Sequence, residues 1–339
     1  MLRRSHSDSD QVVRAPGNLP VRRQKAVRYL LRLLVGGALL YWLISAAGLQ
    51  QLGTSLREIA PAQALLAFLL AIAGQAMTAA RLKTLACLHS IRIDFASAIA
   101  TNLASVFYGL FLPAGNVVGW VLRVWRLSGD SPHLKSVALM VLSDRMVATA
   151  GGAMVGMACW LLDYAHAPPV IGGLLVVVLV TSVVGWLGLS NLLARVVDWM
   201  LEGIPLLRIG RSGSNHALSA DVSRLGPAGT FTLLAQSVAA HLAGSLAWYV
   251  AGIAAGLDLA FVTVAWIRSA VLAATLVPIT ISGLGVREAI IVMLLASFGI
   301  PGHKALAWSL QLFAITTVAV ALLGGLLEAR RILRPGVNG

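Results

Sequence analysis

The chain is dominated by apolar runs of about twenty residues, and these runs limit the folds open to it more than any other feature. Hydrophobic residues make up 58% of the 339 positions and charged residues only 12%, with a mean hydropathy of +0.84. A soluble domain of this size could not carry so much apolar surface without large exposed patches. A helix of roughly 20 residues crosses about 30 Å of hydrocarbon. The sequence therefore predicts an all-α, polytopic membrane protein.

Apolar segments recur along the whole chain, separated by short polar or charged stretches. We predict membrane-embedded helices at residues 27–47, 62–80, 95–112, 120–127, 136–162, 170–189, 229–255, 261–281, 289–300 and 305–327. Residues 289–300 form too short a run to cross a bilayer alone. We therefore predict a bundle of about eight helical segments with two broken or re-entrant units, residues 95–127 and 261–300, each entering and leaving on one side.

The sequence PITISGLGVRE at residues 278–288 interrupts the second unit. It places a proline, two glycines and the adjacent charges of Arg287 and Glu288 between apolar runs. A charge at the centre of a bilayer costs about 2.5 to 3.5 kcal/mol on insertion scales, and a broken helix leaves backbone groups without hydrogen-bond partners. We therefore expect this segment to line a polar cavity or to be buried in protein.

The first unit contains a similar break, LPAGNVVG, at residues 112–119. Arg123 lies ten residues after Pro113, and Arg287 lies nine residues after Pro278. Paired broken helices in opposite orientation are typical of inverted-repeat transporters, whose site lies near the bilayer midplane. We interpret the two units as an inverted repeat. The alternative is that two such breaks coincide by chance in a glycine-rich chain.

The chain carries a formal net charge of +13, which in a soluble protein would suggest a nucleic-acid partner. Here the basic residues lie at helix ends and in particular loops, as the positive-inside rule and contact with anionic lipid predict. We therefore expect no nucleic-acid partner. The same distribution predicts a multi-pass protein of the cell inner membrane with both termini in the cytoplasm.

The chain divides into one membrane domain and two basic tails. We predict a disordered cytoplasmic tail at residues 1–26, a transmembrane domain at residues 27–329 and a basic tail at residues 330–339. Within the domain, residues 190–227 form a cytoplasmic loop that begins with an amphipathic helix. A signal peptide cleaved near residues 45–47 is the competing interpretation, but its charged region would be unusually long.

Three arginines lie at the predicted breaks or deep in predicted spans, namely Arg123, Arg145 and Arg287. A guanidinium group stays charged and binds phosphate through a planar, two-pronged hydrogen bond. We therefore predict that these residues bind an anionic lipid headgroup, with Asp144 and Glu288 holding them in place between lipids. The alternative is that protein alone neutralises them: Asp144 beside Arg145, Glu288 beside Arg287, and Arg123 by reaching the cytoplasmic surface.

The two carboxylates each follow or precede an arginine directly in the sequence. Adjacent residues on a helix point about 100° apart, so neither dipeptide is an ideal ion pair by itself. We therefore predict pairing between the dipeptides, of Asp144 with Arg287 or of Glu288 with Arg145.

We expect the other polar residues to have structural roles and not catalytic or metal-binding ones. Cys87 and Cys159 lie near opposite ends of different predicted spans, so we expect no disulfide and no metal site. We interpret His241 as an interhelical hydrogen-bond donor. The sequence contains no recognisable catalytic triad, paired catalytic carboxylates or phosphate-binding glycine loop. We therefore expect no cofactor and no enzymatic activity.

Three motifs carry a family resemblance: LPAGNVVGWVLRVWRL at residues 112–127, SDR at residues 143–145 and VPITISGLGVREAIIVMLL at residues 277–295. On these residues the chain resembles the family of the lysylphosphatidylglycerol synthase transmembrane region, also called flippase-like membrane proteins. The resemblance implies a domain of about eight helical segments that, in bifunctional relatives, moves an aminoacylated phospholipid between leaflets.

The resemblance does not imply every activity of the relatives for this chain. Relatives perform aminoacyl transfer in a separate soluble domain, and because the sequence ends at Gly339 we expect no synthase activity here. Relatives often have an acidic residue after the glycine of the first motif, where this chain has Trp120. That departure leaves phospholipid, hopanoid and glycolipid substrates open.

Two functional hypotheses follow from the sequence. The first is a lipid transporter of flippase or scramblase type that moves an anionic phospholipid or related lipid between leaflets, with membrane lipids as its partners. The second is a non-catalytic membrane protein that docks a lipid-modifying or glycosyl-transferring enzyme through its loops. A lipid-biosynthesis enzyme is the protein partner that this second hypothesis predicts.

Overall fold

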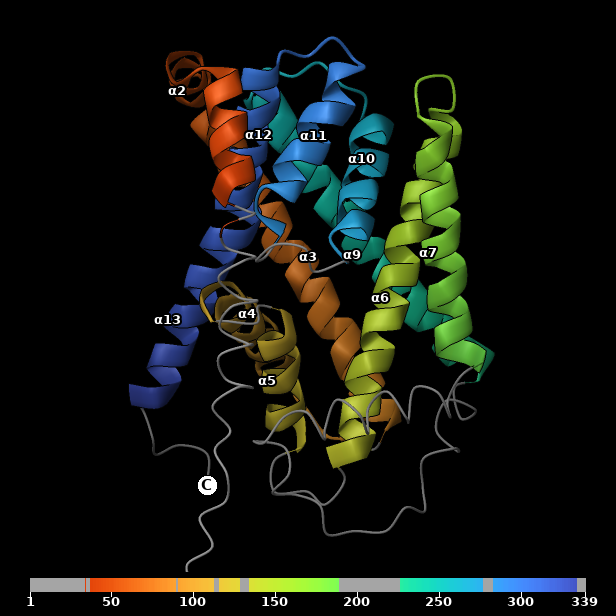
Figure 1. Ribbon diagram of the computed structural model, residues 1–339. Coiled ribbons are helices and arrows are strands. Elements are labelled where there is room, and N and C mark those ends of the chain that lie inside the picture. Colours follow the sequence, from red (N-terminus) through yellow and green to blue (C-terminus); the bar gives the residue numbers. More distant parts are fainter. Residues whose placement is uncertain are drawn as a thin grey trace, which may run out of the picture.

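The computed structural model describes residues 34, 37–89, 91–112, 116–128, 134–188, 226–276 and 283–333. Within these ranges the chain is helical and contains no strand, which confirms the predicted all-α class (Figure 1). The predicted tail at residues 1–26, nearly all of the 190–227 loop and residues 334–339 lie outside the described residues.

The helices follow the apolar segments of the sequence in order. Their bounds are α2 Leu49–Arg57, α3 Pro61–Leu88, α4 Phe95–Phe111, α5 Asn116–Ser128, α6 Leu134–Leu162, α7 Pro169–Gly188, α9 Pro227–Ala254, α10 Phe261–Ala274, α11 Val286–Ala296, α12 Gly302–Phe313, the π-helical turn η3 Ala314–Ala319 and α13 Val320–Leu333. Five stretches are long and apolar enough to cross a membrane: Pro61–Leu88, Leu134–Leu162, Pro169–Trp186, Pro227–Ala254 and Gly302–Leu333.

Local sequence signals set several helix ends. Pro61 and Pro227 occupy the first position of α3 and α9, where the missing N–H is not needed and the fixed φ suits a helix. Asp94 caps α4 by accepting a hydrogen bond from the Ser97 backbone N–H at 3.2 Å. These signals explain why the long helices start where the apolar runs start.

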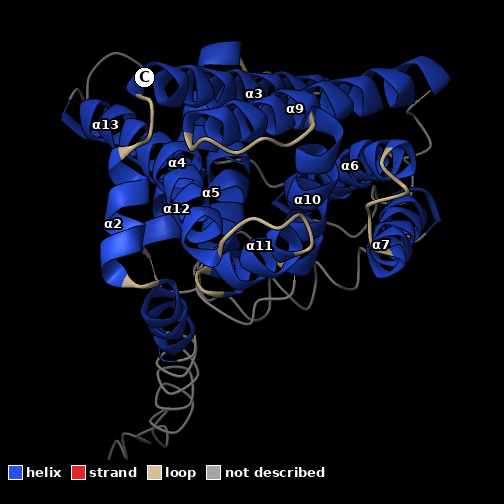
Figure 2. Cartoon of the chain, turned by 90° about the horizontal axis from the view of Figure 1, so that it is seen from above, coloured by secondary structure: helices blue, strands red, loops and turns tan. Residues whose placement is uncertain are grey.

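The long helices form the frame of the bundle. Helices α3 and α9 lie side by side over much of their length, and α6 packs against α9 and α7 (Figures 1 and 2). The predicted span at residues 62–80 is too short, since α3 continues to Leu88. Arg81 therefore lies inside a helix of the frame and not at its end.

Two pairs of short helices lie within this frame. Helix α4 packs against α5, and α10 packs against α11. Figure 1 shows the first pair in the lower half of the molecule and the second pair in the upper half. The predicted helix at residues 261–281 is confirmed as far as Ala274, where α10 ends; residues 275–276 form a turn, and residues 277–281 lie outside the described residues. Both pairs are thus short helices joined at the predicted breaks.

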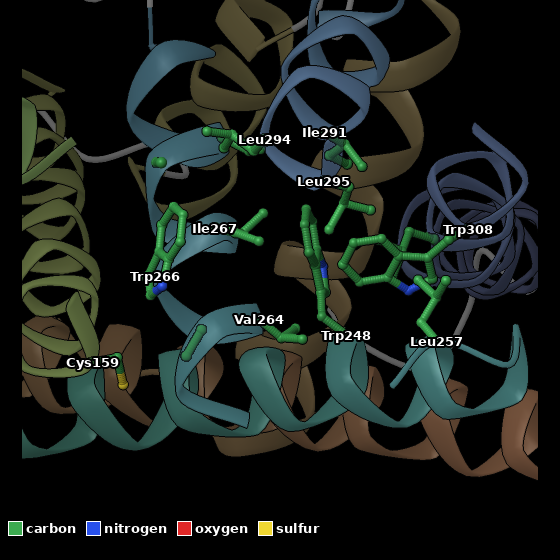
Figure 3. Close-up of a cluster of buried hydrophobic side chains, with 14 of the residues drawn as sticks. Cys159, Trp248, Leu257, Val264, Trp266, Ile267, Ile291, Leu294, Leu295 and Trp308 are labelled. Carbon is green, nitrogen blue, oxygen red and sulfur yellow. The ribbon is translucent and has the colours of Figure 1, made fainter. Parts of the chain in front are cut away.

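The largest apolar cluster joins the second pair to the frame. The indole rings of Trp248 on α9 and Trp308 on α12 meet edge to face, with their centroids 5.7 Å apart. Ile291 and Leu295 of α11 lie over these rings, and Trp266 of α10 belongs to the same cluster (Figure 3). Each of the large side chains at 266, 291, 295 and 308 is fully buried. Packing of this kind fixes α10 and α11 against α9 and α12.

The first pair is fixed instead by glycines at helix crossings. A Cβ atom at Gly324 of α13 would lie 2.1 Å from the Leu103 carbonyl oxygen of α4, and a Cβ at Gly119 of α5 would lie 2.8 Å from the Ser105 carbonyl oxygen. Real Cβ atoms do not approach oxygen this closely, so only glycine permits these crossings. An ion pair between Arg126 of α5 and Glu328 of α13 adds a polar link between the same elements.

Asp163 holds the loop after α6 to the start of α10. Its carboxylate accepts hydrogen bonds from Thr263 Oγ1 at 2.6 Å and Trp266 Nε1 at 2.8 Å, and it contacts His166 Nδ1 at 3.0 Å. Burial raises the pKa of Asp163, but the three hydrogen bonds favour the carboxylate more strongly, so its pKa lies below the ordinary value. The carboxylate therefore stabilises the folded state.

We expect Gly324→Ala to lower the free energy of unfolding by about 2 kcal/mol, because the new methyl group meets backbone atoms of α4 that cannot move aside. Thermal unfolding in detergent measures the effect. Gly173→Ala on α7 is the matched control, since nothing lies within 4 Å of a Cβ there. Equal unfolding temperatures for the two variants would contradict the crossing described above.

We expect Asp163→Asn to be less stable than the natural chain at pH 7 by about 1 kcal/mol, because the neutral amide accepts weaker hydrogen bonds. The folded-state pKa is lowered, so this stabilisation is present above the unfolded-state pKa of about 3.9 and is lost as pH falls through the folded-state value. Unfolding temperatures measured from pH 7 to pH 3 should converge below about pH 4. A gap that widens with falling pH would contradict this sign.

Candidate functional site

The carboxylate of Asp144 lies at the centre of a buried charge cluster. Its Oδ1 atom is 2.8 Å from Arg81 Nε on α3, and its Oδ2 atom is 3.6 Å from Arg123 Nη1 on α5. The Asp144 side chain is 1% exposed, and those of Arg81 and Arg123 are 3% and 14% exposed. One carboxylate on α6 therefore binds two arginines that come from two other helices.

Two serines complete the hydrogen bonding of these arginines. Arg81 Nη1 donates to Ser237 Oγ of α9 at 3.3 Å, and that hydroxyl donates to the Val147 carbonyl of α6 at 3.0 Å. Arg123 Nε donates to Ser105 Oγ of α4 at 3.2 Å. Buried charges are tolerated only when they are paired and hydrogen-bonded in this way. The network also brings α4 and α9 into contact with the cluster.

Arg145 is the cation beside the cluster that makes no ion pair with a described residue. It follows Asp144 on α6, its side chain is exposed, and no carboxylate within the described ranges forms an ion pair with it. It lies eleven residues into α6, which corresponds to about 16 Å along the helix axis. Three guanidinium groups against one carboxylate leave a formal charge of +2 among the described residues at this depth.

Arg287 and Glu288 form the second charged pair, at the start of α11. Gly283 and Gly285 have φ values of 74° and 84°, the left-handed region that favours glycine. The backbone N–H of Gly285 donates to Glu288 Oε2 at 2.6 Å, so Glu288 caps the helix that follows. The other oxygen of Glu288 pairs with Arg287, whose guanidinium carbon lies 4.7 Å from the centre of the Phe313 ring.

The predicted pairing between the two dipeptides is wrong. Arg287 forms an ion pair with its neighbour Glu288. Asp144 forms ion pairs with Arg81 and Arg123. Cβ directions about 100° apart do not exclude pairing between neighbouring residues on a helix. A Glu side chain that folds back to cap a helix can still meet the long side chain of the preceding arginine. Arg123 does not reach for the cytoplasmic surface, because Asp144 and Ser105 hold it inside.

Sequence reasoning missed two cations. Arg81 lies directly after the predicted span at residues 62–80, although the apolar residues that follow Lys83 indicate that the helix continues. Arg268 lies inside the apolar segment of α10, where a lone arginine is itself a signal of function. His241 is the interhelical contact that the sequence predicted, with Nε2 2.9 Å from the Ala148 carbonyl oxygen.

Within the described ranges, no group of three His, Cys, Asp or Glu side chains is placed to hold a metal ion. The charged groups that the described site presents are the guanidinium groups of Arg81, Arg123 and Arg145 and the carboxylate of Asp144. Guanidinium groups bind carboxylates or phosphates.

Comparison with known families gives one match. The family described as Lysylphosphatidylglycerol synthase TM region matches residues 29–324, a range that contains the Asp144 cluster, both short-helix pairs and the Arg287–Glu288 pair. No curated protein matches the chain.

We expect Asp144→Asn to lower the free energy of unfolding by about 3 kcal/mol or more, because it leaves two buried arginines without their shared counter-charge. Combining it with Arg81→Gln should recover part of this loss, since one of the uncompensated charges is then removed. Thermal unfolding of the two single variants and the double variant measures the coupling. Strictly additive losses would contradict the shared pairing.

Proposed function

The chain belongs to the lysylphosphatidylglycerol synthase transmembrane region family, and from this membership and the charge cluster around Asp144 we propose that it moves an anionic lipid between membrane leaflets. It is a multi-pass membrane protein. The proposed activity is of flippase or scramblase type, transport without catalysis. The lipid is an anionic phospholipid or a related lipid with a phosphate group.

The observation that carries the proposal is Arg145, an exposed residue eleven positions after the start of the 29-residue α6, with no ion pair to a described carboxylate. A permanent charge at this depth is costly unless an anion accompanies it. A lipid phosphate would supply that anion and would accept two parallel hydrogen bonds from the guanidinium. The headgroup could then cross the apolar region as a neutralised pair, while its acyl chains stay in lipid.

Neighbouring residues have supporting roles in this proposal. Arg123 lies 3.6 Å from Asp144, a looser contact than the 2.8 Å of Arg81, so it is the paired arginine best placed to turn toward a headgroup. Asp144 and Arg81 position the cluster between passages of lipid. Arg287 and Glu288 are 8% and 0% exposed, so we assign them chiefly to fixing the second helix pair.

The arrangement of short helices supports a route for the headgroup. We propose that α4–α5 and α10–α11 are re-entrant pairs that enter from opposite membrane faces and form an inverted repeat within a domain of about eight segments. The headgroup would pass between their tips. In this proposal the protein lies in the cell inner membrane with both termini in the cytoplasm, as its distribution of basic residues favours.

The test is leaflet exchange in vesicles that contain headgroup-labelled phosphatidylglycerol. A membrane-impermeant quencher reports the label that reaches the outer leaflet. We expect the natural chain to accelerate exchange and Arg145→Gln to slow it about tenfold or more, because a charge-assisted hydrogen bond to the phosphate is lost.

Arg331→Gln is the matched control, since it removes an exposed arginine in the last turn of α13 and should exchange lipid like the natural chain. Arg145→Gln should also retain the natural unfolding temperature, because no ion pair among the described residues depends on Arg145. Exchange by the natural chain that is no faster than in protein-free vesicles would contradict the proposed function.

A further inference from the structure

Arg268 is a second helix-embedded cation that the protein does not neutralise. It lies seven residues after the start of α10 and is half-buried. In the part of the chain that the structure describes, no carboxylate lies within ion-pair distance of it. It differs in this from Arg81, Arg126 and Arg287, which each have a carboxylate partner.

His241 holds the Arg268 guanidinium in place. Its Nε2 atom lies 2.9 Å from the Ala148 carbonyl oxygen of α6, so that nitrogen must carry the proton and donate. Its Nδ1 atom is therefore an acceptor, and Arg268 Nη1 lies 3.2 Å from it. The Arg268 guanidinium is thus held against α9, and the His241 ring links it to α6.

The backbone of α9 is shaped to receive the same guanidinium. A Cβ atom at Gly244 would lie 2.4 Å from Arg268 Nη2 and 2.8 Å from its guanidinium carbon. The arginine therefore occupies space that any other residue at position 244 would fill. His241 and Gly244 lie three residues apart, on one face of α9. Together they form a seat that fixes the position of the charge.

The seated guanidinium keeps free donors. Its hydrogen bonds within the described ranges all use Nη1, to the ring and the carbonyl oxygen of His241. Nε and Nη2, the two atoms through which a guanidinium binds an oxyanion by parallel bonds, have no acceptor in the described ranges, although Nη2 packs against α9 at Gly244. A positive charge fixed between helices suits an anion when its donors lack acceptors and no described carboxylate neutralises it.

We propose that Arg268, positioned by His241 and Gly244, forms a second anion site that binds a phosphate group. His241, which contacts Arg268, also lies against α6 at Ala148 and Gly152, three and seven residues beyond Arg145, or about 5 to 10 Å along the helix axis. The phosphate of one lipid headgroup would then bind first at one of the two arginines, Arg145 or Arg268, and next at the other. That this phosphate belongs to a transported lipid rests on the proposed function. That Arg268 binds an anion does not depend on it.

Binding to the purified full-length chain tests the site. Native mass spectrometry compares uptake of phosphatidylglycerol with that of phosphatidylcholine of the same acyl chains, with and without inorganic phosphate as a soluble competitor. We expect Arg268→Gln to weaken phosphatidylglycerol binding about tenfold or more and to leave phosphatidylcholine binding unchanged.

Gly244→Ala provides a variant that keeps the charge but moves it. The new methyl group meets the far end of a flexible side chain, so the protein should fold while the guanidinium is displaced, and phosphatidylglycerol binding should weaken as in Arg268→Gln. Gly252→Ala on the same helix is the matched control, because a Cβ there meets only ordinary contacts of 3.7 Å or more.

The outcomes separate the two proposals. Weakened phosphatidylglycerol binding in both variants supports the site with a lipid as its ligand. Binding of inorganic phosphate alone, lost in both variants, supports the site with a soluble anion. Unchanged binding of both probes in Arg268→Gln and Gly244→Ala overturns it. Because binding is measured without leaflet exchange, failure of the natural chain to exchange lipid would reject the proposed function without deciding the outcome for this site.

Discussion

The shared ion pair of Asp144 is the interaction on which the lower half of the bundle depends. A carboxylate that is 1% exposed in a span-length helix can stay charged only beside cations, and the nearest are Arg81 of α3 and Arg123 of α5. These two ion pairs hold α3 and α5 against α6. The serines that bind the same arginines extend the constraint to α4 and α9. Apolar packing adds to this arrangement but would not by itself select it.

The charges of the bundle fall into two groups. Those of Arg81, Arg126 and Arg287 are matched by carboxylates and serve to hold helices together. Those of Arg145 and Arg268 have no such match among the described residues, although each lies well inside a helix. A charge inside a membrane helix is costly unless a partner neutralises it, so an unmatched arginine does not stabilise the fold. The proposed lipid route is built on this difference.

The breaks in the helices are supported in two different ways. Before α11, glycines with positive φ and the capping carboxylate of Glu288 satisfy the backbone that the break exposes. At the first pair, the close crossings of Gly119 and Gly324 fix the helices instead. Both supports come from described residues beside the breaks: Gly283, Gly285 and Glu288 for the second pair, and Gly119 and Gly324 for the first.

The sequence by itself determined the all-α class, the positions of most helices and the two interruptions, and it singled out Arg123, Arg145, Arg287, Asp144 and Glu288 as one group. These features follow from local properties, namely the length of apolar runs, helix-breaking residues and the cost of charge in hydrocarbon. Only the tertiary structure decided that Asp144 forms an ion pair with Arg81 and that Glu288 forms one with Arg287. It also decided that Arg268 has no carboxylate partner among the described residues. Ion pairing depends on which helices lie side by side and how deep each charge sits, and spacing along one chain fixes neither.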